Sequence, residues 1–156
     1  MEFLASIEVE KPADIVIAST GGDPKDLNFY QSQKALENVK DLVNPGGIII
    51  LAASCHEGFG EDVFEEWMKD ATDYSLISKR LKENFVLGGH KAVAVARVIS
   101  EKMVFLYSEF DISTTEKMGF KKLDDIQGYL DASIKEDGEV KITVVPCGRF
   151  ARVKSH

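Results

Sequence analysis

Two short runs of mostly apolar residues constrain the fold of this chain more than any other feature of its sequence. They occupy residues 14–19 (DIVIAS) and 48–53 (IIILAA). Consecutive apolar residues suit a strand of a parallel sheet that is covered on both faces. Glycine and proline break the chain at 20–24 and 44–47, and the segment between these breaks has the apolar spacing of a helix. Because strands that alternate with helices imply parallel pairing with right-handed crossovers, we predict a three-layer α/β/α fold with a mostly parallel, Rossmann-like sheet.

The rest of the chain continues this alternation. Residues 24–43 are predicted to form the first helix, with Asp23 as its cap and Pro24 in its first turn. Residues 90–99 fit a strand or a helix, and we predict a helix because only three residues separate them from the next strand. No repeat or long linker divides the chain, so a single domain is expected over residues 1–156. The other predicted elements are helices at 61–70, 73–84 and 123–136 and strands at 103–107 and 140–145.

Charge and composition exclude several classes of partner. Nineteen basic against 26 acidic residues give a formal net charge of −7, whereas nucleic acids and anionic membranes need a dense basic surface. No apolar run approaches the roughly 18 residues of a transmembrane helix, and no charged and then apolar leader opens the chain. The two cysteines lack the spacing of metal ligands. We therefore expect a cytoplasmic protein with reduced cysteines and with no nucleic acid or membrane partner.

Ligands of parallel sheets bind outside the carboxyl ends of the strands, which points to the loops at residues 20–26 and 54–60. Just beyond the first loop, Tyr30, Gln31 and Lys34 flank the apolar arc of the predicted helix. A phenol, an amide and an ammonium group near a helix N-terminus could hold a small carboxylate. A solvated helix face explains the same spacing, and spacing alone favours that alternative.

Several segments resemble, in the same order, the C-terminal domain of the nickel-dependent lactate racemase family. Residues 13–36 run as a strand, Gly-Gly, Pro-Lys-Asp and then Tyr-Gln-x-x-Lys. The resemblance implies that Gln31 and Lys34 bind the carboxylate and hydroxyl of a small 2-hydroxy acid, with Tyr30 beside them, on a concave surface near the first loop. Further matching segments are residues 45–51 (PGGIIIL), 57–60 (EGFG) and 85–92 (FVLGGHKA). The loops implied to line the cleft carry Gly21, Gly22, Lys25, Gly88, Gly89 and His90.

The same resemblance implies a cofactor that this chain does not hold. Family members racemise lactate or related 2-hydroxy acids with a nickel pincer built on a pyridinium mononucleotide. The residues that hold this cofactor, and the histidine acid/base pair, belong to the family's N-terminal domain, and this sequence has no counterpart of them. We therefore expect a substrate-side domain with no catalytic residue, metal or cofactor of its own, which is inactive without the missing N-terminal domain. Asp23 and His56 depart from the family pattern, which leaves open the hydroxy acid that is used.

Other candidate residues carry less weight. Cys55 and His56 are adjacent, so on an extended loop they point in opposite directions and do not form a thiol–imidazole pair. His90, beside Gly-Gly at a predicted helix start, is more typical of a cap or a packing group. The chain has only three histidines, and we predict no zinc or nickel site. The alternative function is a stand-alone binding or regulatory module without catalysis. A flavodoxin-like carrier is a third possibility, for which the first loop offers only Ser19 and Thr20 as hydroxyl donors.

Overall fold

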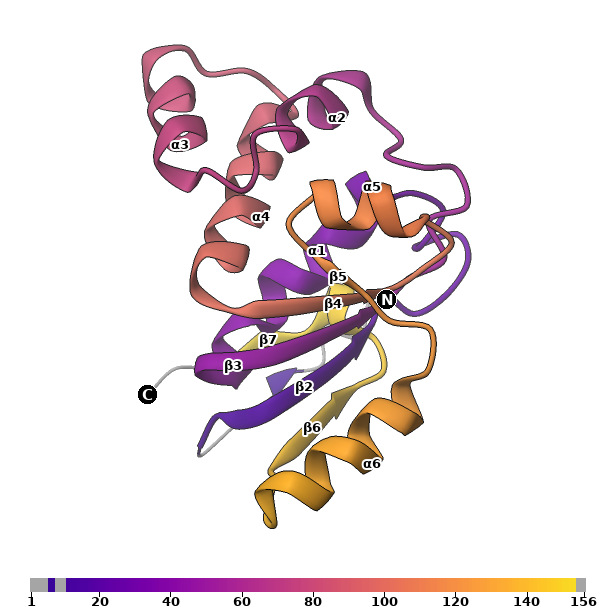
Figure 1. Ribbon diagram of the computed structural model, residues 1–156. Coiled ribbons are helices and arrows are strands. Elements are labelled where there is room, and N and C mark those ends of the chain that lie inside the picture. Colours follow the sequence, from indigo (N-terminus) through magenta and orange to yellow (C-terminus); the bar gives the residue numbers. More distant parts are fainter. Residues whose placement is uncertain (1–5, 8–10, 154–156) are drawn as a thin grey trace.

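A parallel five-stranded sheet forms the centre of the molecule (Figure 1). The structure is a computed structural model that describes residues 6–7 and 11–153. A second, smaller parallel sheet pairs β1 (Ser6–Ile7) with β7 (Arg152–Val153). The predicted α/β class and parallel pairing are confirmed. The strands of the central sheet, in the spatial order β5-β4-β3-β2-β6, are β2 (Ala13–Ser19), β3 (Val43–Ala52), β4 (Met103–Tyr107), β5 (Lys121–Lys122) and β6 (Ile142–Val145).

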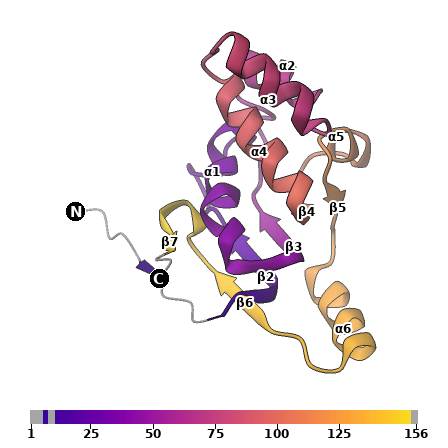
Figure 2. The ribbon, with the colours of Figure 1, turned by 90° about the vertical axis from the view of Figure 1, so that its left-hand side faces the viewer.

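Helices cover both faces of this sheet, so the three-layer arrangement is also as predicted. Helices α1 and α4 lie against one face, α2 and α3 pack beyond them, and α6 lies on the opposite side (Figures 1 and 2). No helix in the described residues is both long enough and apolar enough to cross a membrane. The helices are α1 (Phe29–Val39), η1 (Lys40–Leu42), α2 (Asp62–Met68), α3 (Tyr74–Glu83), α4 (Gly89–Glu101), α5 (Ile112–Lys117), α6 (Ile126–Asp137) and η2 (Gly148–Phe150).

The two faces of the sheet are buried to different degrees. On the face beneath α1 and α4, Ile49, Leu51 and Leu106 are fully buried in the main hydrophobic core. On the face toward α6, Met103 is 42% exposed and Val144 is 63% exposed. Because strand side chains alternate between faces, these residues belong to the opposite set of positions. The more deeply buried face of the sheet is therefore the one beneath α1 and α4.

Helix α1 begins later than its sequence predicts. The prediction that Asp23 caps the helix and that Pro24 lies in its first turn is wrong, because the N-cap is Asn28, whose side chain accepts a hydrogen bond from the Gln31 amide at 3.0 Å. The backbone ahead of the helix pairs with the loop after β3 instead. The Cys55 amide donates to the Asp26 carbonyl at 2.7 Å, and the Glu57 amide donates to the Leu27 carbonyl at 2.8 Å. These bonds hold residues 26–28 outside the helix.

The remaining differences are local. Residues 44–47, predicted as a loop, belong to β3, whose pairing with β2 shifts register between Ala13 and Ile15. The helix predicted at residues 90–99 is confirmed as α4. Short elements such as α5 and β5 were not predicted, because two to six residues carry too little periodicity to identify.

Candidate functional site

The candidate site lies on one flank of α1. The opposite side of the helix is fixed in the core by Phe29, Leu36 and Val39, all fully buried. Tyr30 and Gln31 are half-buried, and the side chain of Lys34 is 51% exposed. The Tyr30 ring meets Phe64 of α2 edge-on, with ring centroids 5.5 Å apart. The helical period thus places Tyr30, Gln31 and Lys34 on an accessible flank of a rigid helix, as the sequence predicts.

The N-terminus of α1 offers few free amides to an anion. The amides of Phe29 and Tyr30 each donate to a carbonyl of the loop after β3, at Gly58 and Phe59 respectively, both at 2.9 Å. The Gln31 amide donates to Asn28 as described above, and the Ser32 amide to the Asn28 carbonyl at 3.1 Å. Amides that are already paired leave little for a ligand. A carboxylate at this flank must therefore be held by side chains.

Helix α4 brings a second lysine to this flank. Gly88 and Gly89 allow the start of α4 to approach α2 closely: a Cβ at Gly88 would lie 2.4 Å from a carboxylate oxygen of Glu61. A Cβ at Gly89 would lie 2.8 Å from the Trp67 ring. This packing holds Lys91 with its Nζ 3.6 Å from the centroid of the Tyr30 ring. The sequence alone does not single out Lys91, although it lies in one of the segments that resemble the family.

His90 has a structural position in the same turn. Its Nδ1 accepts a hydrogen bond from the Gly88 amide at 3.2 Å, and its ring centroid lies 5.6 Å from that of Phe85. His90 thus makes a packing contact with Phe85, while the N-cap of α4 is Gly88, which provides no side-chain hydrogen bond to the helix. Its neighbour Lys91 is the residue of this loop that reaches the α1 flank.

The short helix η2, which carries Arg149, packs against α1. The Asn38 side-chain amide donates to the carbonyls of Gly148 and Arg149 at 3.1 and 2.8 Å. Gly148 is buried, and a Cβ there would lie 3.2 Å from the Ala35 Cβ. These contacts fix η2 against α1.

Burial lowers the pKa of Lys91, and the nearby charges of Arg149 and Lys34 lower it further, against the opposing effect of Glu37 and Glu61. Lys34 forms an ion pair with Glu37 at 3.2 Å. Glu37 and Glu61 therefore partly offset the positive charge around Lys91.

The first loop lies beside η2. Lys25 places its Nζ 5.1 Å from the Phe150 ring centroid, and the Gly21 amide donates to Ser19 Oγ at 3.1 Å. Gly22 lines a cavity of about 470 Å³ at the carboxyl ends of the strands. Tyr30, Gln31 and Lys34 are not among the residues that line this cavity. The other residues that line this cavity are Ser19, Asp26, Ala52, Ala53, Ser54, Tyr107, Ser108, Glu109 and Asp124.

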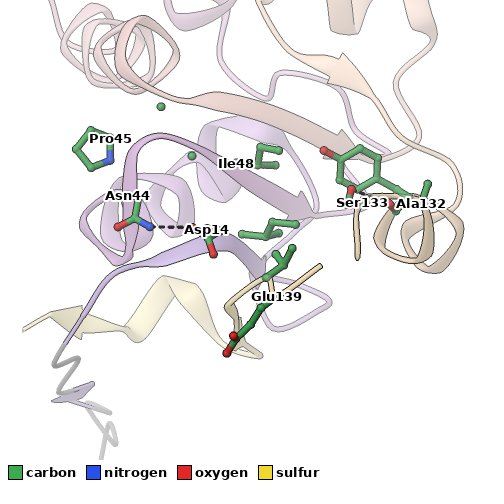
Figure 3. Close-up of a pocket in the computed structure, with 12 residues that line it drawn as sticks. Asp14, Asn44, Pro45, Ile48, Ala132, Ser133 and Glu139 are labelled. Atoms are coloured by element: carbon green, nitrogen blue, oxygen red, sulfur yellow. Dashed lines mark hydrogen bonds between the residues drawn. The ribbon is translucent and has the colours of Figure 1, made fainter. Parts of the chain in front are cut away.

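A larger cavity, of about 570 Å³, lies at the opposite edge of the sheet (Figure 3). It opens between the amino ends of β2 and β3 and helix α6, where Asn44 donates to an Asp14 carboxylate oxygen at 3.0 Å. Ser133 of α6 and Glu139 complete its polar lining. Parallel sheets bind ligands at their carboxyl ends, so we assign no ligand to this cavity.

The loop after β3 does not contain a nucleophile. Cys55 is buried, with its Sγ 3.6 Å from Ser32 Oγ, and burial raises the pKa of its thiol to about 11. His56 is exposed, and its Nδ1 lies 3.1 Å from Ser54 Oγ. The same hydroxyl lies 3.4 Å from Glu109, so the serine stands between the imidazole and the carboxylate. A catalytic triad needs the imidazole in the middle, so this arrangement does not activate the serine.

Comparison with known proteins agrees with the fold and with the family resemblance of the sequence. Residues 8–150 match the model of the lactate racemase C-terminal domain family. The chain is 32% identical over 155 residues to the lactate racemase of Thermoanaerobacterium thermosaccharolyticum, covering 94% of this chain and 36% of that protein. It is 29% identical over 150 residues to the lactate racemase of Lactiplantibacillus plantarum, covering 90% of this chain and 35% of that protein.

Two solved structures share the fold of this chain. The lactate racemase apoprotein of T. thermosaccharolyticum superposes with a TM-score of 0.83 at 29% identity, over 97% of this chain and 37% of that one. A Thermotoga maritima protein shares the fold at a TM-score of 0.62 and 18% identity, over 96% of this chain and 39% of that one. The chain spans about a third of the length of the curated relatives that it matches. This chain belongs to the lactate racemase C-terminal domain family.

Proposed function

We propose that this chain forms the substrate side of the active site of a nickel-pincer 2-hydroxy-acid racemase. The observation that carries the proposal is the accessible flank of α1, where Tyr30, Gln31 and Lys34 project from a helix whose other side is locked in the core. Membership of the family and the naming of two longer relatives as lactate racemases support it. A rigid helix is a good platform for residues that must orient a small substrate.

The side chains have complementary roles toward a hydroxy acid. The Lys34 ammonium group supplies charge for the carboxylate, and the Gln31 amide donates to the carboxylate or hydroxyl oxygen. The exposed ion pair between Lys34 and Glu37 contributes only about 0–1 kcal/mol, so a substrate carboxylate can replace Glu37 at low cost. With the carboxylate held, the bond that changes at the adjacent carbon keeps a fixed orientation, which lowers the barrier through positioning.

The residues that the structure describes do not offer a ligand set for nickel. Within the described ranges, no group of three or more histidine, cysteine, aspartate or glutamate side chains could hold a metal ion. His56 and His90 are each engaged as described above. We therefore place the nickel cofactor, which supplies hydride chemistry in the family, outside this chain and assign no step to it here.

Binding of lactate to the isolated chain tests this proposal. In an amide NMR titration of the 15N-labelled chain, L-lactate should shift the signals of residues 29–34, whereas glycerol, which lacks the carboxylate, should not. Lys34→Ala should abolish the shifts. Lys40→Ala, at the far end of the same helical segment, is the matched control and should leave them unchanged. Shifts that survive in Lys34→Ala, or that occur only elsewhere on the domain, would contradict the assignment.

A further inference from the structure

The Tyr30 ring on the α1 flank is contacted by side chains from two other helices. Phe64 of α2 meets it edge-on, with ring centroids 5.5 Å apart. From α4, the Lys91 ammonium group stands over the ring, with its Nζ 3.6 Å from the ring centroid. An ammonium group within about 6 Å of an aromatic centroid is attracted by the negative face of the ring. The Tyr30 ring is therefore restrained by one apolar and one electrostatic contact.

The Lys91 side chain is committed to this contact. Within the described residues it forms no ion pair with an acidic side chain, and Glu37 and Glu61 influence its charge only from farther away. The side chain is half-buried, and a cation that has lost part of its hydration interacts more strongly with an aromatic face. The close packing of Gly88 and Gly89 against α2 fixes the first turn of α4, from which Lys91 projects. The position of this cation is therefore built into the fold.

We infer that Lys91 is a positioning residue of the α1 flank, which acts through Tyr30 by holding its ring so that the phenol hydroxyl can donate to the bound carboxylate. The inference rests on the proposed function, in which Gln31 and Lys34 hold that carboxylate. A phenol has one O–H donor, and hydrogen bonds weaken steeply when they are misaligned, so a ring that is free to rotate loses part of this contact. The alternative is a direct contact between Lys91 and the ligand, whose effect would not need the tyrosine hydroxyl.

A double-mutant cycle on the full 156-residue chain tests the inference. Dissociation constants for L-lactate are measured by NMR titration of the 15N-labelled protein, from the shifts of residues 29–34. Lys91→Met, which removes the charge from a long side chain, should weaken binding by about three- to tenfold, and Lys91→Arg should restore most of the affinity. In the Tyr30→Phe background, Lys91→Met should have no further effect, because the hydroxyl through which Lys91 acts is gone. Arg97→Met removes an exposed cation from the same helix and is the matched control, which should leave the dissociation constant unchanged.

The outcomes separate this inference from the function on which it rests. If L-lactate shifts residues 29–34 and Lys91→Met binds it as tightly as the natural chain does, the inference is refuted and the proposed function stands. If Lys91→Met weakens binding equally in both backgrounds, Lys91 contacts the ligand directly and is not a positioning residue. Failure of Lys91→Arg to restore the affinity would also overturn the inference, and absence of binding at α1 would refute both proposals. Lys91→Gln takes the place of Lys91→Met if the latter loses the amide spectrum of the folded chain.

Discussion

The close approach of Gly60 to Asn28 gives a quantitative test of how the α1 flank is positioned. Gly60 has a φ of +84°, and a Cβ placed on it would lie 2.2 Å from the Asn28 Cγ and 2.5 Å from its Nδ2. Asn28 is only 8% exposed and caps α1. Gly60→Ala must therefore push the cap away from the helix that carries Tyr30 and Gln31.

The expected cost has two parts. An alanine forced into the left-handed region costs about 1–2 kcal/mol. Loss of an asparagine cap costs about 0.5–2 kcal/mol. Gly60→Ala should therefore lower the free energy of unfolding by about 1.5–4 kcal/mol, measured by urea titration with circular dichroism. Gly58→Ala is the matched control, because its φ is +73° but no atom lies within 4 Å of the added Cβ. It should lose about 1–2 kcal/mol alone.

A double mutant isolates the contact. Asn28→Gly removes all three asparagine atoms that the new Cβ would meet, and glycine is itself an acceptable N-cap. In the Asn28→Gly background, Gly60→Ala should cost only about 1–2 kcal/mol, the same as Gly58→Ala. If Gly60→Ala costs no more than Gly58→Ala in the natural sequence, or costs equally in both backgrounds, the reasoning about this contact is wrong.

Three further predictions follow from the same structure. Lys34→Ala should change the free energy of unfolding by less than about 0.5 kcal/mol, because its ion pair is exposed; a larger loss in urea titration would make Lys34 structural. The buried Cys55 thiol, whose pKa is raised to about 11, should resist thiol reagents that modify the exposed Cys147 at neutral pH. The pKa of Cys55 is higher in the folded than in the unfolded chain, so the difference in unfolding free energy between the natural chain and Cys55→Ala should be constant below pH 9. This difference should fall by up to about 3 kcal/mol toward pH 11. A difference that stays constant in alkaline unfolding titrations would contradict this. The purified chain, incubated with nickel, should bind no stoichiometric amount of the metal and show no racemase activity. One tightly bound nickel ion per chain, found by metal analysis, would refute this.

The parts of the fold that depend on periodicity and length could be predicted from the sequence. Helix α4 was identified against a possible strand because only three residues separate its segment from β4. The start of α1 could not be predicted, because Asp23 and Pro24 are good local helix-start signals. Long-range hydrogen bonds from residues 55–57 override these signals. Local propensity is a weak guide wherever tertiary pairing competes for the same backbone.

Some residues of the candidate site could likewise be predicted from the sequence, and others could not. Tyr30, Gln31 and Lys34 share one helix, so their spacing places them together without further information. Lys91 and Arg149 come from α4 and η2, more than fifty residues from α1 along the chain, and meet it only through tertiary packing. No spacing rule connects residues across such distances, so these cations could be found only in the structure.

Racemisation by a chimera tests the central claim most directly. Residues 8–150 would replace the matching domain of the T. thermosaccharolyticum lactate racemase, which shares this fold at a TM-score of 0.83. With the nickel cofactor loaded, Lys34→Ala should raise the KM for lactate by about ten- to a hundredfold, as expected for a lost charge-assisted contact, while Lys40→Ala leaves it unchanged. An active chimera whose KM and turnover are the same with and without Lys34 would contradict the account.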